Sequence, residues 1–109
     1  MMDMESTVME LIINAGEARS CAMQALRAAR QYKWQDADAQ LTGATAAAKA
    51  AHKIQTALIG EDEGVGKLPM NLILVHAQDH LMNAMLCREL AEEIILLHRE
   101  IAALKQATN

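Results

Sequence analysis

The chain has 109 residues, which is enough for one hydrophobic core, and we expect a single domain over residues 1–109. Hydrophobic residues make up 52% of the chain, but with no Phe the core must be built from Ala, Leu, Ile and Met, which favour helices over strands. The net charge is -4, and no cluster of Lys or Arg stands beside aromatic residues, which argues against binding of nucleic acid or anionic membranes.

The first predicted element is a helix over about residues 8–31, because apolar residues recur at steps of three and four from Val8 onward. Thr7 and Glu10 have the spacing of a capping box at its start. Gly16 lies inside this helix and costs about 1 kcal/mol relative to Ala, so we interpret it as a site of close helix contact.

A second helix is predicted over about residues 35–59. Its apolar positions alternate in steps of four and three and form a heptad seam, composed mostly of alanine, that lets a neighbouring backbone approach closely. The seam consists of Ala37, Leu41, Ala44, Ala48, Ala51, Gln55 and Leu58. The segment Gly60–Lys67 that follows combines three glycines with three acids, so we expect an exposed loop. A phosphate-binding loop is a poor alternative, because the Walker pattern is absent and the acids would repel phosphate.

The third predicted helix spans about residues 69–106, with Pro69 in its first turn and no break in the pattern before Gln106. Its apolar residues point in every direction, because residues 72–75 and 94–97 are consecutive apolar runs. An antiparallel three-helix bundle covers only a stripe about 100° wide on each helix. The sequence therefore predicts an all-α bundle that self-associates through this helix with closed cyclic symmetry. The alternative is a monomer with a few exposed leucines.

The cysteines and the N-terminus predict a reducing, cytoplasmic setting. Cys21 and Cys87 are far apart in sequence and lack CxxC or His-rich spacing, so we expect two reduced, buried thiols. The first ten residues carry acids where a signal peptide has bases, and no apolar run reaches the ~18 residues of a membrane span.

Polar residues interrupt the third helix within the stretch Leu72–Met85. Steps of three and four place four of them on one strip of the helix, which consists of His76, Asp79, His80 and Asn83. Gln78 faces away from this strip. Polar groups that a neighbouring subunit desolvates cost about 1–3 kcal/mol each unless they find partners, so we expect the strip to carry chemistry.

Three interpretations fit this strip. His76 and His80 have the i, i+4 spacing of zinc-binding helices, but Ala77 stands where a metalloprotease has its glutamate, and no third ligand lies nearby. A histidine can instead be a nucleophile for phosphoryl transfer, because a neutral imidazole nitrogen attacks phosphorus and the resulting phosphoramidate passes the group on. The third interpretation is a set of satisfied interface histidines that fix the register of an oligomer. The strip itself favours neither of the last two.

The stretch VHAQDHLM, Val75–Met82, resembles the signature of the lactose/cellobiose/chitobiose class of IIA proteins in the bacterial sugar phosphotransferase system. The first helix of this class resembles MELIINAGEARSCAMQAL, its glycine-rich acidic loop resembles GEDEGVGK, and the end of its third helix resembles ELAEEIILLH. The resemblance implies a phosphotransferase component that forms a homotrimer of three-helix subunits, with the nucleophile in a shallow cleft between subunits.

The resemblance implies that His76 is phosphorylated by phospho-HPr, the general phosphocarrier, and then donates the group to a cysteine of the cognate IIB protein. IIB passes it to a sugar entering through the permease IIC, so the membrane is involved only indirectly. A β-linked disaccharide is implied, with cellobiose or chitobiose slightly ahead of lactose. Asp79 is implied to approach the trimer axis, where three copies gather around Mg²⁺ or another divalent cation. Gathered carboxylates need a cation or a proton, and oxygen ligands suit a hard cation rather than zinc.

The remaining polar residues have less defined expectations. His80, one turn from His76, either orients the phosphorylated ring and contacts the phosphoryl oxygens or is a satisfied interface residue. Gln78 and Asn83 are candidate donors around the site, although the resemblance gives Asn83 no role because the class often has a hydroxyl residue there. Solvated surface positions are expected for the histidines outside the motif, His52 and His98. The alternative function is a structural helical oligomer whose polar strip only sets assembly.

Overall fold

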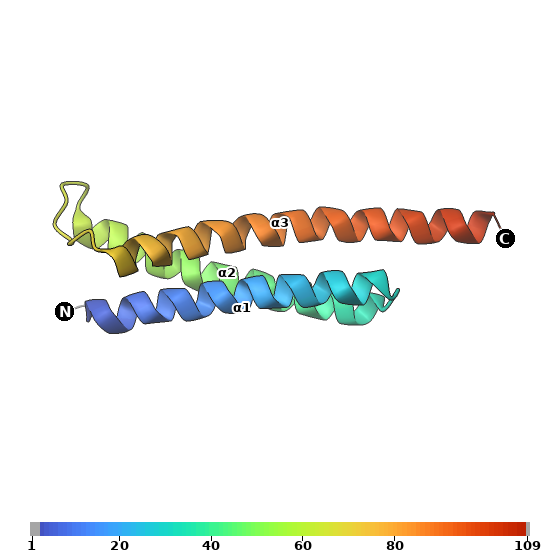
Figure 1. The fold of residues 1–109 in the computed structure, drawn as a ribbon, viewed down its shortest axis with the longest axis horizontal. Helices are drawn as coiled ribbons and strands as arrows, with labels where there is room; N and C mark the ends of the chain where they lie inside the picture. The colour runs from blue at the N-terminus through green and yellow to red at the C-terminus, as the bar shows by residue number, and fades with distance from the viewer. Residues whose placement is uncertain (1–2, 109) are drawn as a thin grey trace.

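The computed structural model of the protein describes residues 3–108 and consists of three long α-helices (Figure 1). The helices are α1 (Met4–Arg30), α2 (Trp34–Asp62) and α3 (Leu72–Ala107). Each helix runs antiparallel to the one before it, and the described residues contain no β-strand, which confirms the predicted all-α fold. Residues 1, 2 and 109 of the predicted domain lie outside the described residues. Within the described part of the chain, no helix has an apolar stretch long enough to span a membrane.

The N-terminus of α1 differs from the prediction. The helix begins at Met4, and the N-cap residue Asp3 has an extended backbone. The Ser6 hydroxyl donates a hydrogen bond to Oδ2 of Asp3 at 2.7 Å, and the Thr7 amide donates to the Asp3 carbonyl at 2.9 Å. Thr7 therefore lies inside the helix. The predicted capping box of Thr7 and Glu10 is wrong, because Asp3 already provides the first carbonyl of the helical ladder.

The start of α3 also differs from the prediction. The helix begins at Leu72 and not at Pro69. Asn71 is the N-cap, with an extended backbone and a side-chain oxygen that accepts a hydrogen bond from the Leu74 amide at 3.0 Å. This bond satisfies one of the first-turn N–H groups that have no partner within the helix. Pro69 lies in the preceding loop, so its predicted place in the first turn is wrong.

The acidic loop is exposed, as predicted, but one side chain ties it to the end of α2. The helix continues to Asp62, past the predicted end at residue 59, and stops where Glu63 takes a left-handed conformation with φ 55°. The Asp62 carboxylate accepts hydrogen bonds from the amides of Gly66 and Leu68, at 3.2 and 3.0 Å. Residues 63–67 are exposed. Asp62 therefore sets the path of the chain toward α3.

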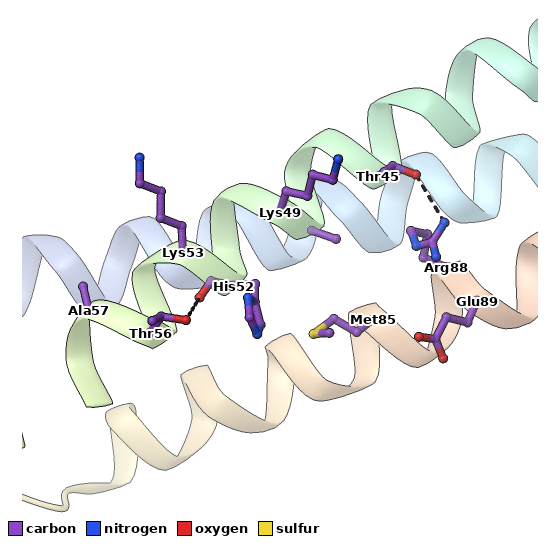
Figure 2. Close-up of a pocket in the computed structure, with 10 residues that line it drawn as sticks. Thr45, Lys49, His52, Lys53, Thr56, Ala57, Met85, Arg88 and Glu89 are labelled. Carbon is purple, nitrogen blue, oxygen red and sulfur yellow. Dashed lines mark hydrogen bonds between the residues drawn. The ribbon is translucent and has the colours of Figure 1, made fainter. Parts of the chain in front are cut away.

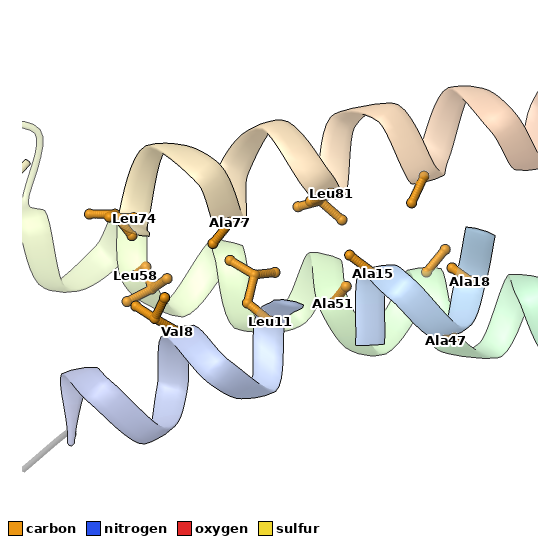
Figure 3. Close-up of a cluster of buried hydrophobic side chains, with 12 residues drawn as sticks. Val8, Leu11, Ala15, Ala18, Ala47, Ala51, Leu58, Leu74, Ala77 and Leu81 are labelled. Carbon is orange, nitrogen blue, oxygen red and sulfur yellow. The ribbon is translucent and has the colours of Figure 1, made fainter. Parts of the chain in front are cut away.

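The core is thin and made mainly of alanine (Figure 3). Leu11 of α1 and Leu81 of α3 are the largest fully buried side chains. Most of the predicted α2 seam is buried, namely Ala37, Ala44, Ala48, Ala51 and Leu58. The other two seam residues are half-buried, Leu41 and Gln55. Short side chains bring the helix backbones close together, so large apolar residues outside this seam are left on the surface.

Gly43, and not Gly16, is the glycine at a close helix contact. A Cβ placed on Gly43 would lie 3.4 Å from Sγ of Cys21, whereas a Cβ on Gly16 would meet nothing within 4 Å. The predicted contact at Gly16 is wrong, because α1 turns this position toward open space. Both cysteines are free thiols, but only Cys21 is buried and Cys87 is half-buried, so burial was predicted correctly for Cys21 alone.

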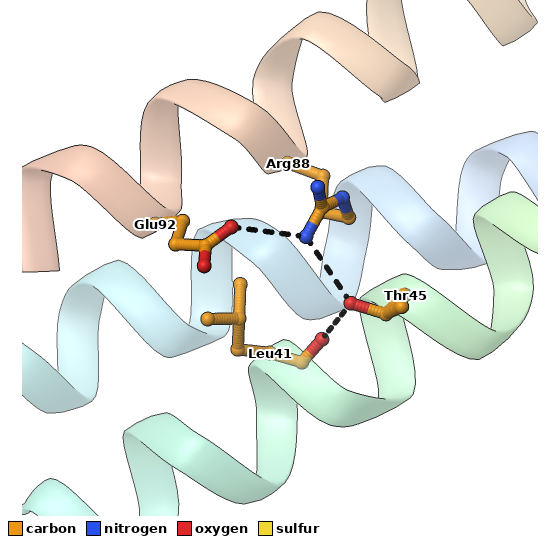
Figure 4. Close-up of polar contacts among 4 residues, drawn as sticks. All are labelled: Leu41, Thr45, Arg88 and Glu92. Carbon is orange, nitrogen blue, oxygen red and sulfur yellow. Dashed lines mark hydrogen bonds and ion pairs between the residues drawn. The ribbon is translucent and has the colours of Figure 1, made fainter.

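A polar contact joins α2 and α3 beside the core (Figure 4). Nη1 of Arg88 donates to the Thr45 hydroxyl at 3.2 Å and lies 3.3 Å from the Glu92 carboxylate. The Thr45 hydroxyl donates in turn to the Leu41 carbonyl at 3.0 Å. A partly solvated ion pair of this kind adds little stability. Its main consequence is that the Arg88 side chain is fixed across the groove between the two helices.

The subunit is elongated, and α3 extends past the turn between α1 and α2 (Figure 1). Its radius of gyration is 17.4 Å, compared with about 13 Å for a compact domain of this length. Only six of the 36 residues of α3 are buried, while Leu72 is 85% and Leu104 66% exposed. The predicted surplus of apolar surface on α3 is therefore present.

Candidate functional site

His76 and His80 lie one helical turn apart on α3, and their imidazole rings stack. The ring centroids are 5.2 Å apart and the ring planes are inclined by 28°. His76 is exposed and His80 is half-buried. Among residues 3–108, neither ring takes part in a side-chain hydrogen bond or an ion pair. The His76 imidazole is thus accessible to solvent, while the half-buried His80 imidazole packs against it.

Asp79 and Gln78 point in different directions, as the helical spacing predicts. Asp79 is exposed, and its Oδ2 accepts a hydrogen bond from the Asn83 amide nitrogen at 3.2 Å. The Gln78 side chain faces α2 instead and is hydrogen-bonded to the Gln55 amide. The geometry of α3 therefore contains the predicted strip, and Gln78 faces away from this strip, as predicted.

Asp79 interrupts an apolar outer face of α3, which turns away from α1 and α2. This outer face is formed by exposed apolar side chains, namely Leu72, Val75, Met82, Leu86, Leu97 and Leu104. Together with Asp79 these residues recur mostly at steps of three and four, the spacing of a coiled-coil seam. The Asp79 carboxylate thus lies within an otherwise apolar seam, and in the described chain its only hydrogen-bond partner is Asn83.

Within residues 3–108, no three His, Cys, Asp or Glu side chains of one chain are grouped so that they could hold a metal ion. Among these residues, the His76 and His80 pair thus has no third ligand from its own chain. Asp79 likewise belongs to no such group within residues 3–108. A hard cation would find several carboxylate oxygens here only if symmetry copies of Asp79 came together.

A hollow of about 350 Å³ lies beside His80, between α3 and α1. Residues from one face of α1 form most of its lining, which consists of Gly16, Arg19, Ser20, Met23, Arg27 and His80. The α1 side of this site was not predicted from the sequence. The signal available was the recurrence of Gly16, Arg19, Met23 and Arg27 at steps of three and four, which puts two cations on one helix face.

A larger hollow of about 690 Å³ lies on the opposite side of α3, between α2 and α3 (Figure 2). Its basic side chains are those of Lys49, His52, Lys53 and Arg88. Figure 2 shows the His52 ring pointing across the groove, with Met85 on the facing helix. His52 is exposed, as expected, but His98 is half-buried, so the expectation of a solvated position is wrong for His98.

The exposed His76 ring has the properties that a phosphoryl-carrying nucleophile needs. A neutral imidazole nitrogen with access to solvent can attack phosphorus, and the phosphoramidate that forms can pass the group to a second nucleophile. His76 lines none of the described hollows and lies on the surface of α3.

Comparisons with known proteins place the chain in a family. A model of the family described as PTS system, lactose/cellobiose specific IIA subunit, matches residues 6–99. The N,N'-diacetylchitobiose-specific EIIA component of Escherichia coli K12 is 48% identical over 101 residues, which cover 93% of this chain and 87% of that protein. The lichenan-specific phosphotransferase enzyme IIA component of Bacillus subtilis is 40% identical over 106 residues, covering 97% and 96% of the two chains.

Solved structures show the same relationship. The crystal structure of the cellobiose-specific enzyme IIA from Bacillus anthracis superposes with a TM-score of 0.88 at 43% identity and covers 94% of both chains. The IIA(chitobiose) chain in the solution structure of its complex with HPr from Escherichia coli has a TM-score of 0.81 at 46% identity, covering 94% of this chain and 99% of that one. The chain therefore belongs to the lactose/cellobiose-specific IIA family of the phosphotransferase system, and it is a phosphotransferase component.

Proposed function

We propose that the protein is a cytoplasmic phosphocarrier that accepts a phosphoryl group from phospho-HPr on Nε2 of His76 and passes it to a cysteine of the cognate IIB protein. The exposed His76 ring is the observation that carries this proposal. The similar IIA(chitobiose) chain has been solved in complex with HPr, which supports HPr as the donor here. Transfer in both directions needs an imidazole that two successive proteins can reach, and the surface position of His76 meets that requirement.

The outer face of α3 supports assembly as a homotrimer. An apolar seam along most of a helix of 36 residues is buried when identical helices pack around a common axis. In a ring of this kind, the α1 side of one α3 meets the α2 side of the next. His76 then faces the neighbouring subunit's copy of the hollow in Figure 2, and the cleft between subunits becomes the docking site for HPr and IIB.

Asp79 fits a divalent cation such as Mg²⁺ only in this trimer. At the axis, three copies of the carboxylate would supply the oxygen ligands that a hard cation prefers. When bound, the cation offsets the repulsion between three like charges. Asn83, which donates to Asp79 within each chain, would orient these carboxylates. We propose that the cation acts in assembly and not in the phosphoryl transfer, because Asp79 would turn toward the axis while His76, offset by about 60° around the helix, would face the cleft between subunits.

The pathway sugar is proposed to be a β-linked disaccharide, with chitobiose or cellobiose ahead of lactose. The similar relatives are named for N,N'-diacetylchitobiose, lichenan and cellobiose, and also for galactose. This spread of sugars among similar carriers agrees with sugar choice by IIB and IIC. We therefore expect no tight binding of free sugar to the carrier.

Incubation with phosphoenolpyruvate, enzyme I and HPr tests the proposal. The protein should gain one acid-labile phosphate per chain, the His76→Ala variant should gain none, and the matched control His98→Ala should be labelled like the wild type. The rival function is a structural helical oligomer in which the polar strip only sets assembly. That rival predicts no phosphate on the wild type and a changed oligomeric state in His76→Ala.

A further inference from the structure

The hollow beside His80 is bordered on α1 by Gly16, which has no side chain. A Cβ there would meet nothing within 4 Å, so this part of α1 faces open space. His80 lines this hollow, and the His76 ring stacks on His80 with centroids 5.2 Å apart. A group attached to His76 would therefore lie next to the mouth of the hollow.

The wall of this hollow is cationic. Arg19 and Arg27 both line it, one and three turns along α1 from Gly16. In residues 3–108 the Arg19 guanidinium has no hydrogen bond or ion pair. The nearby acid Glu17 is turned elsewhere, because its carboxylate accepts a hydrogen bond from Sγ of Cys21. Arg19 is thus an exposed cation whose donors are unused.

A phosphoryl group on His76 requires such donors. It carries about two negative charges, and the interior of α3 offers it no free backbone N–H groups, because these are bonded within the helix. A guanidinium presents a planar fork of N–H groups that matches two phosphoryl oxygens. Of the cations that line the hollow, Arg19 lies closer along α1 to Gly16 than Arg27 does.

We propose that the guanidinium of Arg19 binds the phosphoryl oxygens during transfer to and from His76, with the hollow beside His80 as the seat of the phosphoryl group. This inference rests on the proposed function of His76. In loading, the Nε2 lone pair forms a bond to phosphorus while the bond to the donor atom breaks and its electron pair leaves with the donor. In unloading, the cysteine thiolate of IIB forms the bond to phosphorus and the N–P electron pair returns to Nε2. In both steps the Arg19 guanidinium stabilises the charge on the equatorial oxygens.

The test compares Arg19→Gln, Arg19→Lys and the wild type with two phosphoryl donors, phospho-HPr and the small molecule phosphoramidate. With both donors, Arg19→Gln should load His76 more slowly, on the order of tenfold to 100-fold, because one charged donor is lost. Arg19→Lys should fall in between, since it keeps the charge but loses the fork. The matched control is Arg30→Gln, an exposed arginine of α1 that does not line the hollow.

A spectroscopic readout separates binding of the phosphoryl group from a general effect on structure. In the phosphorylated protein, the second pKa of the phosphoryl group should be higher in Arg19→Gln than in the wild type or in Arg30→Gln, as followed by ³¹P NMR during a pH titration. A nearby cation favours the dianion, so its removal raises this pKa.

The outcomes distinguish this inference from the proposed function. If the wild type takes up no phosphate, the proposed function itself is wrong. If the wild type is loaded and Arg19→Gln is loaded equally fast, Arg19 does not bind the phosphoryl group. Slower loading from phospho-HPr with unchanged loading from phosphoramidate would assign Arg19 to protein docking, which also overturns the inference.

Discussion

The imidazole of His80 lies against that of His76, with ring centroids 5.2 Å apart and ring planes inclined by 28°. Because His80 is half-buried and His76 is exposed, the pair has an inner and an outer member. The inner ring restricts the orientations of the outer one and lies beside the hollow lined by α1. In the proposed phosphoryl transfer, we therefore expect His76 to be the nucleophile and His80 to orient it.

Replacement of His80 tests this division. We predict that His80→Ala still becomes phosphorylated on His76, but about tenfold to 100-fold more slowly, because the nucleophile is less well oriented. Rapid-quench measurement of labelling by phospho-HPr gives the rate, and peptide mapping gives the position of the phosphate. If His80→Ala takes up no phosphate while His76→Ala is still labelled, then His80 and not His76 is the nucleophile.

Replacement of Asp79 tests the proposed axis. We predict that Asp79→Leu forms trimers at least as stable as those of the wild type and no longer gains stability from Mg²⁺, because three mutually repelling carboxylates are replaced by apolar groups. Light scattering after gel filtration, and thermal unfolding with Mg²⁺ or a chelator, provide the measurements. Asp79→Asn is the control that removes the charge and keeps the shape. Dissociation of Asp79→Leu into monomers would contradict the account.

The Asp62 carboxylate holds the acidic loop through the amides of Gly66 and Leu68. We predict that Asp62→Ala lowers the free energy of unfolding by about 1–2 kcal/mol, since two hydrogen bonds to a charged acceptor are lost at a partly exposed site. Urea unfolding measures this change, and hydrogen exchange should speed up at the two amides. Glu61→Ala, an exposed neighbour, is the control and should change little. Equal loss in both variants would show that Asp62 does not hold the loop.

The thiol of Cys21 should react slowly. Burial raises the pKa of the Cys21 thiol above its ordinary value, and the neighbouring Glu17 carboxylate raises this pKa further. The thiolate is therefore scarce near neutral pH, and an aromatic disulfide reagent should modify Cys87 before Cys21. Since the fold favours the neutral thiol, this group's contribution to stability should decline as pH rises through the alkaline range. Glu17→Gln should speed up modification of Cys21, and an unchanged rate would exclude the carboxylate as a cause.

Periodicity predicted the three helices and the polar strip, because both follow directly from 3.6 residues per turn. The helix ends were less predictable. Thr7 and Glu10 match the sequence pattern of a capping box, but the N-cap of the helix is Asp3. Only the backbone conformation at Asp3 shows which of the two residues, Asp3 or Thr7, is the N-cap. Likewise Pro69 is compatible with a first turn, whereas the hydrogen bond between Asn71 and Leu74 sets the start of α3.

The α1 side of the site could not be predicted from one sequence alone. The spacing on α3 defines which residues share a strip, but it does not show which helix lies beside His80. Gly16 illustrates the difficulty, because a glycine inside a helix is compatible with a close contact or with an open space, and here it borders a hollow. Only the packing of α1 against α3 brings Arg19 into the neighbourhood of the histidine pair.

The central claim is that one histidine both receives and passes on the phosphoryl group, and a chase experiment tests it most directly. The protein is labelled with ³²P from phosphoenolpyruvate, purified away from HPr and enzyme I, and mixed with the cognate IIB protein. The account predicts that the label leaves His76 and appears on the IIB cysteine, and that a IIB variant with Ser in place of this cysteine receives none. Label that stays on the protein, or is released only as inorganic phosphate, would contradict the account.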